Sequence, residues 1–355
     1  MTDLVTTPDP AHRPDPRGRP RGPRIAPEPG PARLPEPRGP LSAALLTGLR
    51  HPPGTAHPWP ATVAGDPFGE DLQLTLYLCY ELHYHGLPGV HADWEWDPAL
   101  LRFRAAAERR FLDVLRSATA GGTDVAGCLD TLLVEPVDGR GISHHLREKG
   151  QWWQFREFLV HRSLYHLKEA EPHAWAIPRL RGGAQAALVA VEFDEFGGGR
   201  ADRMHAELFA ASMAAAGLDN RYLHYLDAVP AAPLAIVNMM SLFGLHRSLR
   251  GALVGHFAAA EISTAPSARR MVAALERLGA PEACVRFHSE HVEADAVHEQ
   301  VMRHEVVADL LAREPELAAD VVLGIQATQL VEDRFERQVL DAWTAGRSSL
   351  RRPLD

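Results

Sequence analysis

The 355-residue chain has little cysteine and almost no lysine. Its three cysteines, Cys79, Cys128 and Cys284, are scattered and form no CxxC pair. This excludes a disulfide framework and a cysteine-rich zinc site, and it is typical of a reducing compartment. Arginine supplies nearly all of the positive charge, since Lys149 and Lys168 are the only lysines. The net charge of −9, with no basic stripe to offset it, argues against a general nucleic-acid binder.

Long hydrophobic runs are also absent. The longest apolar stretch, about 229–245, contains Pro230, Pro233 and Asn238 and is too short to span a membrane. The N-terminus lacks the apolar core of a secretory signal. A composition with 46% hydrophobic and 23% charged residues suits a globular protein with a sizeable core. We therefore expect a soluble, cytoplasmic protein without a membrane partner.

Alternating strand patterns and hairpin turns are scarce, so the sequence predicts an all-α fold. Asp97 and Pro98 are typical of a helix start, and Ser267 is expected to cap another helix that ends before Gly279. The expected helices span 71–84, 98–118, 124–135, 143–169, 181–196, 201–216, 232–245, 247–262, 268–278, 289–312 and 315–344.

The chain divides into three expected parts. Residues 1–45 are dominated by proline and arginine and have too little apolar surface to offset the entropy of ordering, which predicts a disordered tail. Residues 46–150 are expected to form a helical N-terminal part that packs on the main bundle. Residues 151–345 are expected to form that bundle.

One stretch near the C-terminal end places metal-competent side chains together. His291, Asp295 and His298 are spaced i, i+4, i+7, so they fall within roughly 60° of one helix face. The same face carries Met302 and Val306 and is expected to be buried. A buried carboxylate requires a partner. The pattern alone leaves two interpretations open, a metal site and a hydrogen-bonded His–Asp–His cluster in the core.

Partners for such a site lie upstream, because carboxylate-bridged metal pairs in helical bundles take ligands from several helices. Glu195 and His205 flank a glycine triplet that allows a break in the helix. Glu261 follows small apolar residues in a helix with few charges, and Glu169 lies shortly before Pro172.

This arrangement resembles the haem-oxygenase-like diiron oxidases and oxygenases, also called iron-containing redox enzymes. Members that oxygenate nitrogen show a Glu, nine residues, a His, later a lone Glu, and H-x3-D-x2-H about thirty residues on. The resemblance covers about 150–310, and it implies a haem-oxygenase-like helical bundle with two irons. The implied ligands are Glu169, Glu195, His205, Glu261, His291, Asp295 and His298.

The resemblance also implies the reaction. In the family, a ferrous pair reacts with dioxygen (O2) and oxidises an amine nitrogen or an unactivated C–H bond. Glu169 occupies the place of an additional Glu that some members use when oxygen binds, and this makes it the expected catalytic residue. Four carboxylates would balance the charge of two ferrous ions, and a mixed nitrogen and oxygen shell favours iron or manganese.

We therefore expect an O2-dependent non-haem diiron oxidoreductase acting on an amine or amino-acid-derived small molecule. Its expected partners are that substrate and an electron donor, and the oligomeric state stays open, with a homodimer as one option. Two alternatives remain at this point. One is a metal-free enzyme of the same superfamily, and the other is a non-catalytic helical interaction protein.

Overall fold

Helices make up the regular structure of the protein, as predicted. The computed structural model describes residues 33–354 except 56 and 135–138, and it also leaves out the side chains of 293–296. No strand occurs in these described ranges. The α-helices are α1 (Pro40–Leu49), α2 (Glu70–Glu81), α3 (Pro98–Ala118), α4 (Val125–Leu133), α5 (Ile142–Lys149), α6 (Trp152–His166), α7 (Glu171–Ala174), α8 (Gly182–Glu195), α9 (His205–Ala215), α10 (Ala231–Leu245), α11 (Arg250–Leu278), α12 (Glu282–Val301), α13 (Ala308–Arg313) and α14 (Ala318–Thr344).

Short helices of tighter or wider pitch join these elements. A π-helix, η6 (Met302–Val307), continues α12 into α13. The 3-10 helices are η1 (Ala92–Trp96), η2 (Ile177–Arg179), η3 (Gly197–Gly199), η4 (Ala201–Arg203), η5 (Arg247–Leu249) and η7 (Pro315–Leu317). Within the described part, no helix is both long enough and apolar enough to cross a membrane.

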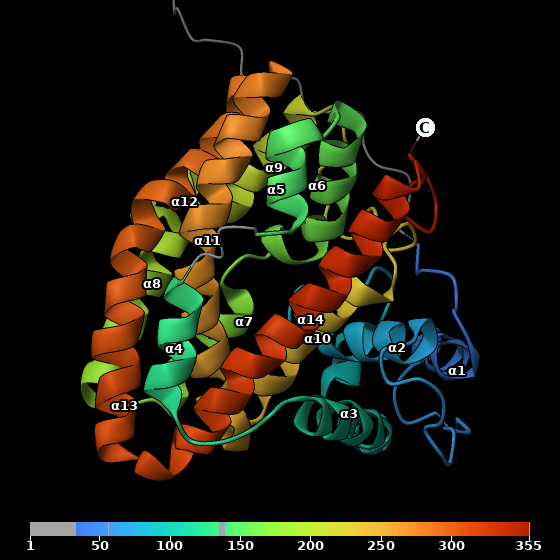
Figure 1. Ribbon diagram of the computed structural model, residues 1–355. Coiled ribbons are helices and arrows are strands. Elements are labelled where there is room, and N and C mark those ends of the chain that lie inside the picture. Colours follow the sequence, from blue (N-terminus) through green and yellow to red (C-terminus); the bar gives the residue numbers. More distant parts are fainter. Residues whose placement is uncertain (1–32, 56, 135–138, 355) are drawn as a thin grey trace, which may run out of the picture. The chain divides into compact units, whose positions relative to one another are not determined.

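The long helix α11 lies at the centre of the unit that begins at Leu34, with α12 along one side and α14 crossing another (Figure 1). Two glycines permit the crossing of α11 and α14. A Cβ atom on Gly255 would lie 2.1 Å from the carbonyl oxygen of Val321, and one on Gly324 would lie 2.0 Å from that of Ala252. Any larger residue at either position would push the two helices apart.

The N-terminal helices pack on the same core. Helix α2 contacts α10, and α1 lies on α2 (Figure 1). The apolar side of α1 packs against the core, and its residues Leu41, Leu45, Leu46 and Leu49 are all buried. The expected tail boundary at residue 45 is therefore wrong. The helix begins at Pro40, and its four buried leucines, spread over more than two turns, hold it against the core. Residues 1–32 lie outside the described part.

Several helix boundaries differ from the sequence expectation. The expected helix 143–169 is broken at Gly150, where a Cβ atom would lie 2.5 Å from the Cα of Leu146. Ser267 caps nothing, because α11 runs unbroken through Pro266. Packing of α11 against α5, α12 and α14 outweighs the local penalty of the proline. Helix α12 begins at Glu282, one to two turns earlier than expected.

Candidate metal centre

The candidate ligands come from five places in the fold. Glu169 lies between α6 and α7, Glu195 ends α8, and His205 begins α9. Glu261 lies within α11, and α12 carries His291 and His298. All six residues are buried, with exposed fractions of 2–8%. The structure therefore brings together side chains that are up to 129 positions apart in sequence, from Glu169 to His298.

The turn between α8 and α9 is built by glycine. Gly197, Gly198 and Gly199 all have positive φ angles of 62–77°, a region that L side chains rarely adopt. At Gly197 a Cβ atom would also lie 2.6 Å from the backbone carbonyl carbon of Arg203. The glycines let the chain leave the helix between α8 and α9, and across this break Glu195 Oε2 comes within 2.8 Å of His205 Nδ1.

The first cluster consists of Glu169, His205 and His291. Their ligand-type atoms all lie within 4.8 Å of one another. Glu169 Oε1 is 3.6 Å from His291 Nε2, and the rings of His205 and His291 have their centroids 4.4 Å apart. One carboxylate and two imidazoles thus converge on one point.

The second cluster consists of Glu195, Glu261 and His298, whose ligand-type atoms also lie within 4.8 Å of one another. His298 Nδ1 is 3.1 Å from Glu261 Oε2 and 3.6 Å from Glu195 Oε1. The other ring nitrogen of His298 is 3.3 Å from Asp194 Oδ2. Asp194 therefore holds the ring while Nδ1 faces the two buried carboxylates.

Glu195 joins the two clusters. Its Oε2 faces His205 of the first cluster at 2.8 Å, and its Oε1 faces His298 of the second at 3.6 Å. A carboxylate with one oxygen toward each of two sites is the arrangement found where a Glu bridges a metal pair in a helical bundle.

The polar atoms of the centre fit a cation better than they fit one another. Among the described residues, Glu169 Oε2 and His205 Nδ1 are buried and have no hydrogen-bond partner. The 2.8 Å contact between His205 and Glu195 thus lacks hydrogen-bond geometry. Buried polar atoms without partners are costly, and a shared metal ion would satisfy both.

His291 has its ring fixed for ligation through one nitrogen. Its Nδ1 lies 2.8 Å from the backbone carbonyl oxygen of Phe287, one helical turn earlier. A carbonyl oxygen only accepts, so Nδ1 carries the hydrogen and donates it. Nε2, which faces Glu169, is then the nitrogen whose lone pair can bind a metal when the ring is neutral.

Burial and neighbouring charge set the electrostatics of the second cluster. Burial alone would lower the pKa of His298, but Glu261 and Glu195 outweigh it and raise that pKa to about 9. Burial raises the pKa of Glu261, and Glu195 adds to this effect while His298 opposes it. Without a metal, the proton on His298 offsets part of the negative charge. A cation of higher charge would stabilise the same carboxylates more strongly.

The first cluster is more strongly ionised. Burial opposes the charge on Glu169, but the imidazoles of His166 and His291 outweigh it and lower the pKa of this carboxyl well below its usual value. His166 Nδ1 lies 2.6 Å from Glu169 Oε1. His166 was not among the expected site residues, although its position three residues before Glu169, at a helix end, could have indicated it.

For Glu192 the sequence favours a surface role over a place beside a ligating histidine, and this prediction is wrong. It lies one helical turn before Glu195 and is only 3% exposed, and neither of its carboxylate oxygens has a hydrogen-bond partner in the described part of the chain. Burial, with Glu195 and Glu261 nearby, raises its pKa to about 9. Its i, i+3 spacing places it on the same side of α8 as Glu195. The seventh expected ligand, Asp295, lies in α12, but its side chain is outside the described residues.

A cavity of about 380 Å³ reaches the centre. Four candidate ligands line it, namely Glu169, Glu195, Glu261 and His291. Apolar and aromatic side chains, including Phe158, form part of its wall, and charged residues from α14 and α11 form another part. This volume is within the range of small-molecule sites.

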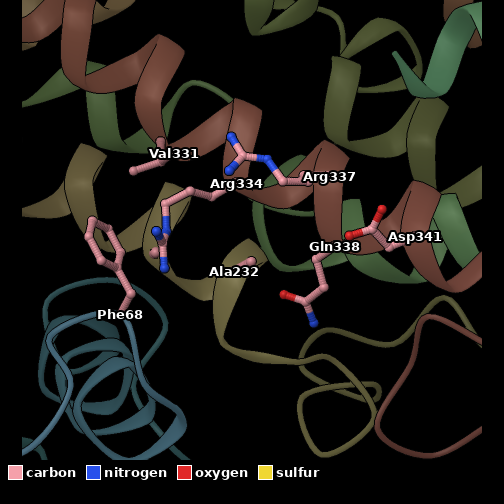
Figure 2. Close-up of a pocket in the computed structure, with 8 residues that line it drawn as sticks. Phe68, Ala232, Val331, Arg334, Arg337, Gln338 and Asp341 are labelled. Atoms are coloured by element: carbon pink, nitrogen blue, oxygen red, sulfur yellow. The ribbon is translucent and has the colours of Figure 1, made fainter. Parts of the chain in front are cut away.

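A second cavity, of about 360 Å³, is separate from the centre. Figure 2 shows its side chains, among them Phe68, Arg334 and Gln338. The guanidinium of Arg334 lies 4.0 Å from the ring centroid of Phe68. By helical spacing Arg334 and Gln338 occupy the face of α14 opposite to the one that lines the first cavity. None of the candidate ligands contributes to it.

The fold and the centre define a class of protein, a helical bundle with a buried carboxylate and imidazole site that fits metal ions. Comparison with known families agrees. Residues 156–333, half of the chain, match the family described as iron-containing redox enzyme. The chain belongs to this family, so it is an oxidoreductase of an iron-containing type, as the resemblance predicted. No curated protein matches the chain.

Proposed function

We propose that the protein is a non-haem diiron oxidase or oxygenase that uses O2 to oxidise a small amine or amino-acid-derived molecule. The observation that carries this proposal is the pair of three-residue clusters joined by Glu195. The unpartnered buried atoms of Glu169 and His205 support it, because a bound cation would satisfy both.

Each iron would have its own set of ligands, with one ligand in common. His205, His291 and Glu169 would hold one iron, His298 and Glu261 the other, and Glu195 would bind both. The bound irons would supply the electrons that activate dioxygen. Buried ligands from α8, α9, α11 and α12, with Glu169 from the turn before α7, would hold the centre in place, and the cavity leads to it. In the metal-free protein Glu192 holds a proton beside Glu195, since burial raises its pKa to about 9.

The cavity wall supports a substrate that carries both charges. Glu332, Asp333 and Glu336 on α14 line it, as do Arg140, Arg162 and Arg270. Arg162 and Glu332 already form a two-pronged pair at 2.8 Å per contact. Burial raises the pKa of both Asp333 and Glu336, which shows that neither carboxylate is fully compensated by the arginines nearby. A positively charged amine would stabilise them.

Product analysis with isotopic oxygen tests this proposal. The iron-loaded protein, a reductant and a panel of amines and amino acids would be incubated under ¹⁸O2. We expect oxygen uptake that depends on substrate, with one labelled oxygen in an N-oxygenated or C–H-oxidised product. His291→Ala should abolish uptake, and His304→Ala, an exposed position on the following π-helix, should retain it. Iron-loaded protein that consumes no oxygen with any reductant would refute the proposal.

A further inference from the structure

Lys168, next to the candidate ligand Glu169, is buried with a carboxylate. The side chain of Lys168 is 1% exposed and that of Glu81, the last residue of α2, is 0% exposed. Nζ of Lys168 lies 2.7 Å from Glu81 Oε2, and the hydroxyl of Tyr222 donates to Glu81 Oε1 at 2.7 Å. Every oxygen of this carboxylate therefore has a partner.

Aromatic rings enclose the ammonium group. Nζ of Lys168 lies 4.1 Å from the ring centroid of Tyr84, 5.1 Å from that of Tyr77 and 5.9 Å from that of Tyr222. The rings favour the cation and exclude water from it. Removing two charges from water is costly, and an apolar pair of similar size is often at least as stable. Stability alone is therefore a weak reason for an ion pair at this position.

The backbone shows what the ion pair can control. Lys168, Glu169 and Ala170 form the turn between α6 and α7. Ala170 has a φ angle of 71°, which an alanine adopts only when its surroundings impose it. The Lys168 side chain reaches α2, while Glu169 reaches His166 and His291. The two neighbouring side chains thus point in different directions. Because they share one short stretch of backbone, fixing the position of Lys168 restricts the position of Glu169.

We propose that Lys168 is a positioning residue for Glu169. The Lys168–Glu81 pair anchors the turn to α2, and this anchor holds Glu169 at the first cluster in spite of the strained backbone at Ala170. This inference rests on the proposed function, in which Glu169 is a metal ligand. It predicts that loss of the pair weakens metal binding at the first cluster. The second cluster should stay intact, because none of its ligands lies on α2 or in the turn between α6 and α7.

Metal titration of a charge-free variant tests the inference. Lys168→Met alone leaves Glu81 buried and unpaired and can prevent folding, so the test variant is Lys168→Met/Glu81→Leu, which removes both charges. Cobalt(II) would be titrated anaerobically into the full-length chain, and its visible spectrum would report each site. Lys149→Met is the matched control, because Lys149 is exposed at the end of α5. Circular dichroism would verify folding of each variant.

The expected result is a loss of about 10- to 100-fold in affinity for one cobalt, the range seen when a partner that orients a ligand is removed. The second cobalt should bind as in the unsubstituted protein. In a Glu169→Ala background the same double substitution should change neither affinity. A folded variant that binds both ions normally, or that weakens both sites equally, would refute the positioning role. An unsubstituted protein that binds no cobalt would instead refute the proposed function and this inference with it.

Discussion

Glu195 is the single residue on which both clusters depend. One of its oxygens faces His205 and the other faces His298. Every other described candidate ligand belongs to one cluster only. Substitutions of the two α12 histidines should therefore separate the clusters, although the two side chains lie on the same face of one helix.

We expect His291→Ala to lose the metal of the first cluster and His298→Ala to lose the metal of the second, each leaving about one equivalent bound. Asp295→Ala is also expected to lose at least one equivalent, from its spacing alone. His304→Ala should retain full loading, because His304 is exposed on the π-helix that follows α12. Metal analysis after equilibrium dialysis measures all four. Equal losses in all four variants would show that the metal lies against a different face of the helix.

Metal uptake at the second cluster should depend on pH in a defined direction. The pKa of His298 in the metal-free protein is about 9, so this ring carries a proton at neutral pH that a metal must displace. Apparent affinity should rise about tenfold per pH unit from pH 7 to 9 and level off above that range. Calorimetry in buffers of different ionisation enthalpy measures the released proton. Affinity that is flat across this interval would contradict protonation of His298.

At the scale of elements, the glycine turn between α8 and α9 determines how close Glu195 and His205 come. We expect Gly197→Ala to weaken metal binding at the first cluster, because its Cβ atom would lie 2.6 Å from the backbone at Arg203 and Met204. Gly199→Ala is the matched control. Its φ of 77° imposes similar strain, but its Cβ atom would meet only Phe193, at 3.6 Å. The backbone strain should cost each variant about 1 kcal/mol or more.

Only Gly197→Ala should also displace His205, so a comparison of cobalt affinities separates the two effects. Equal losses of affinity in both variants would mean that strain, and not the clash, controls the site.

Element boundaries could be predicted where the determining signal is local. Asp97 accepts hydrogen bonds from the amides of Ala99 and Leu100, as its place before Pro98 indicated, and Gly279 ends α11 with a φ of 64°. Ser267 gave a similar local signal for a helix start, yet tertiary packing of α11 overrides it.

The candidate site shows the same limit. Helical spacing identified His291 and His298, because helical periodicity is encoded locally, and the family resemblance implied the other four described candidates that converge with them. Spacing could not assign His291 and His298 to different clusters, since that depends on which neighbouring helix each one faces. Nor could it reveal that Glu192 is buried, because a carboxylate at a helix end is commonly exposed.

At the scale of the whole molecule, buried neutral histidines should make stability sensitive to acid. Burial lowers the pKa of His161 to about 3 and that of His256 to about 4. In the unfolded chain both should titrate near 6.5. The unfolded state therefore binds more protons below pH 6.5, and stability falls as the pH drops from 6.5 toward these folded values.

In that interval, we expect each of these histidines to lower the free energy of unfolding by up to about 1.4 kcal/mol for each pH unit of acidification. Urea unfolding of metal-free protein at several pH values measures it. His256→Asn should have a shallower dependence on pH than the unsubstituted protein, whatever its stability at pH 7. His304→Asn, at an exposed position, should leave the slope unchanged. Parallel curves for all three proteins would show that His256 is not held neutral by burial.

Two irons held in clusters that share Glu195 are the feature on which the proposed function depends. Anaerobic titration of the full-length, metal-free chain with ferrous iron, followed by metal analysis of the desalted protein, tests it most directly. We expect saturation at about two irons per chain, one for each cluster. Saturation at one iron, or no retained iron at all, would contradict a shared two-iron centre.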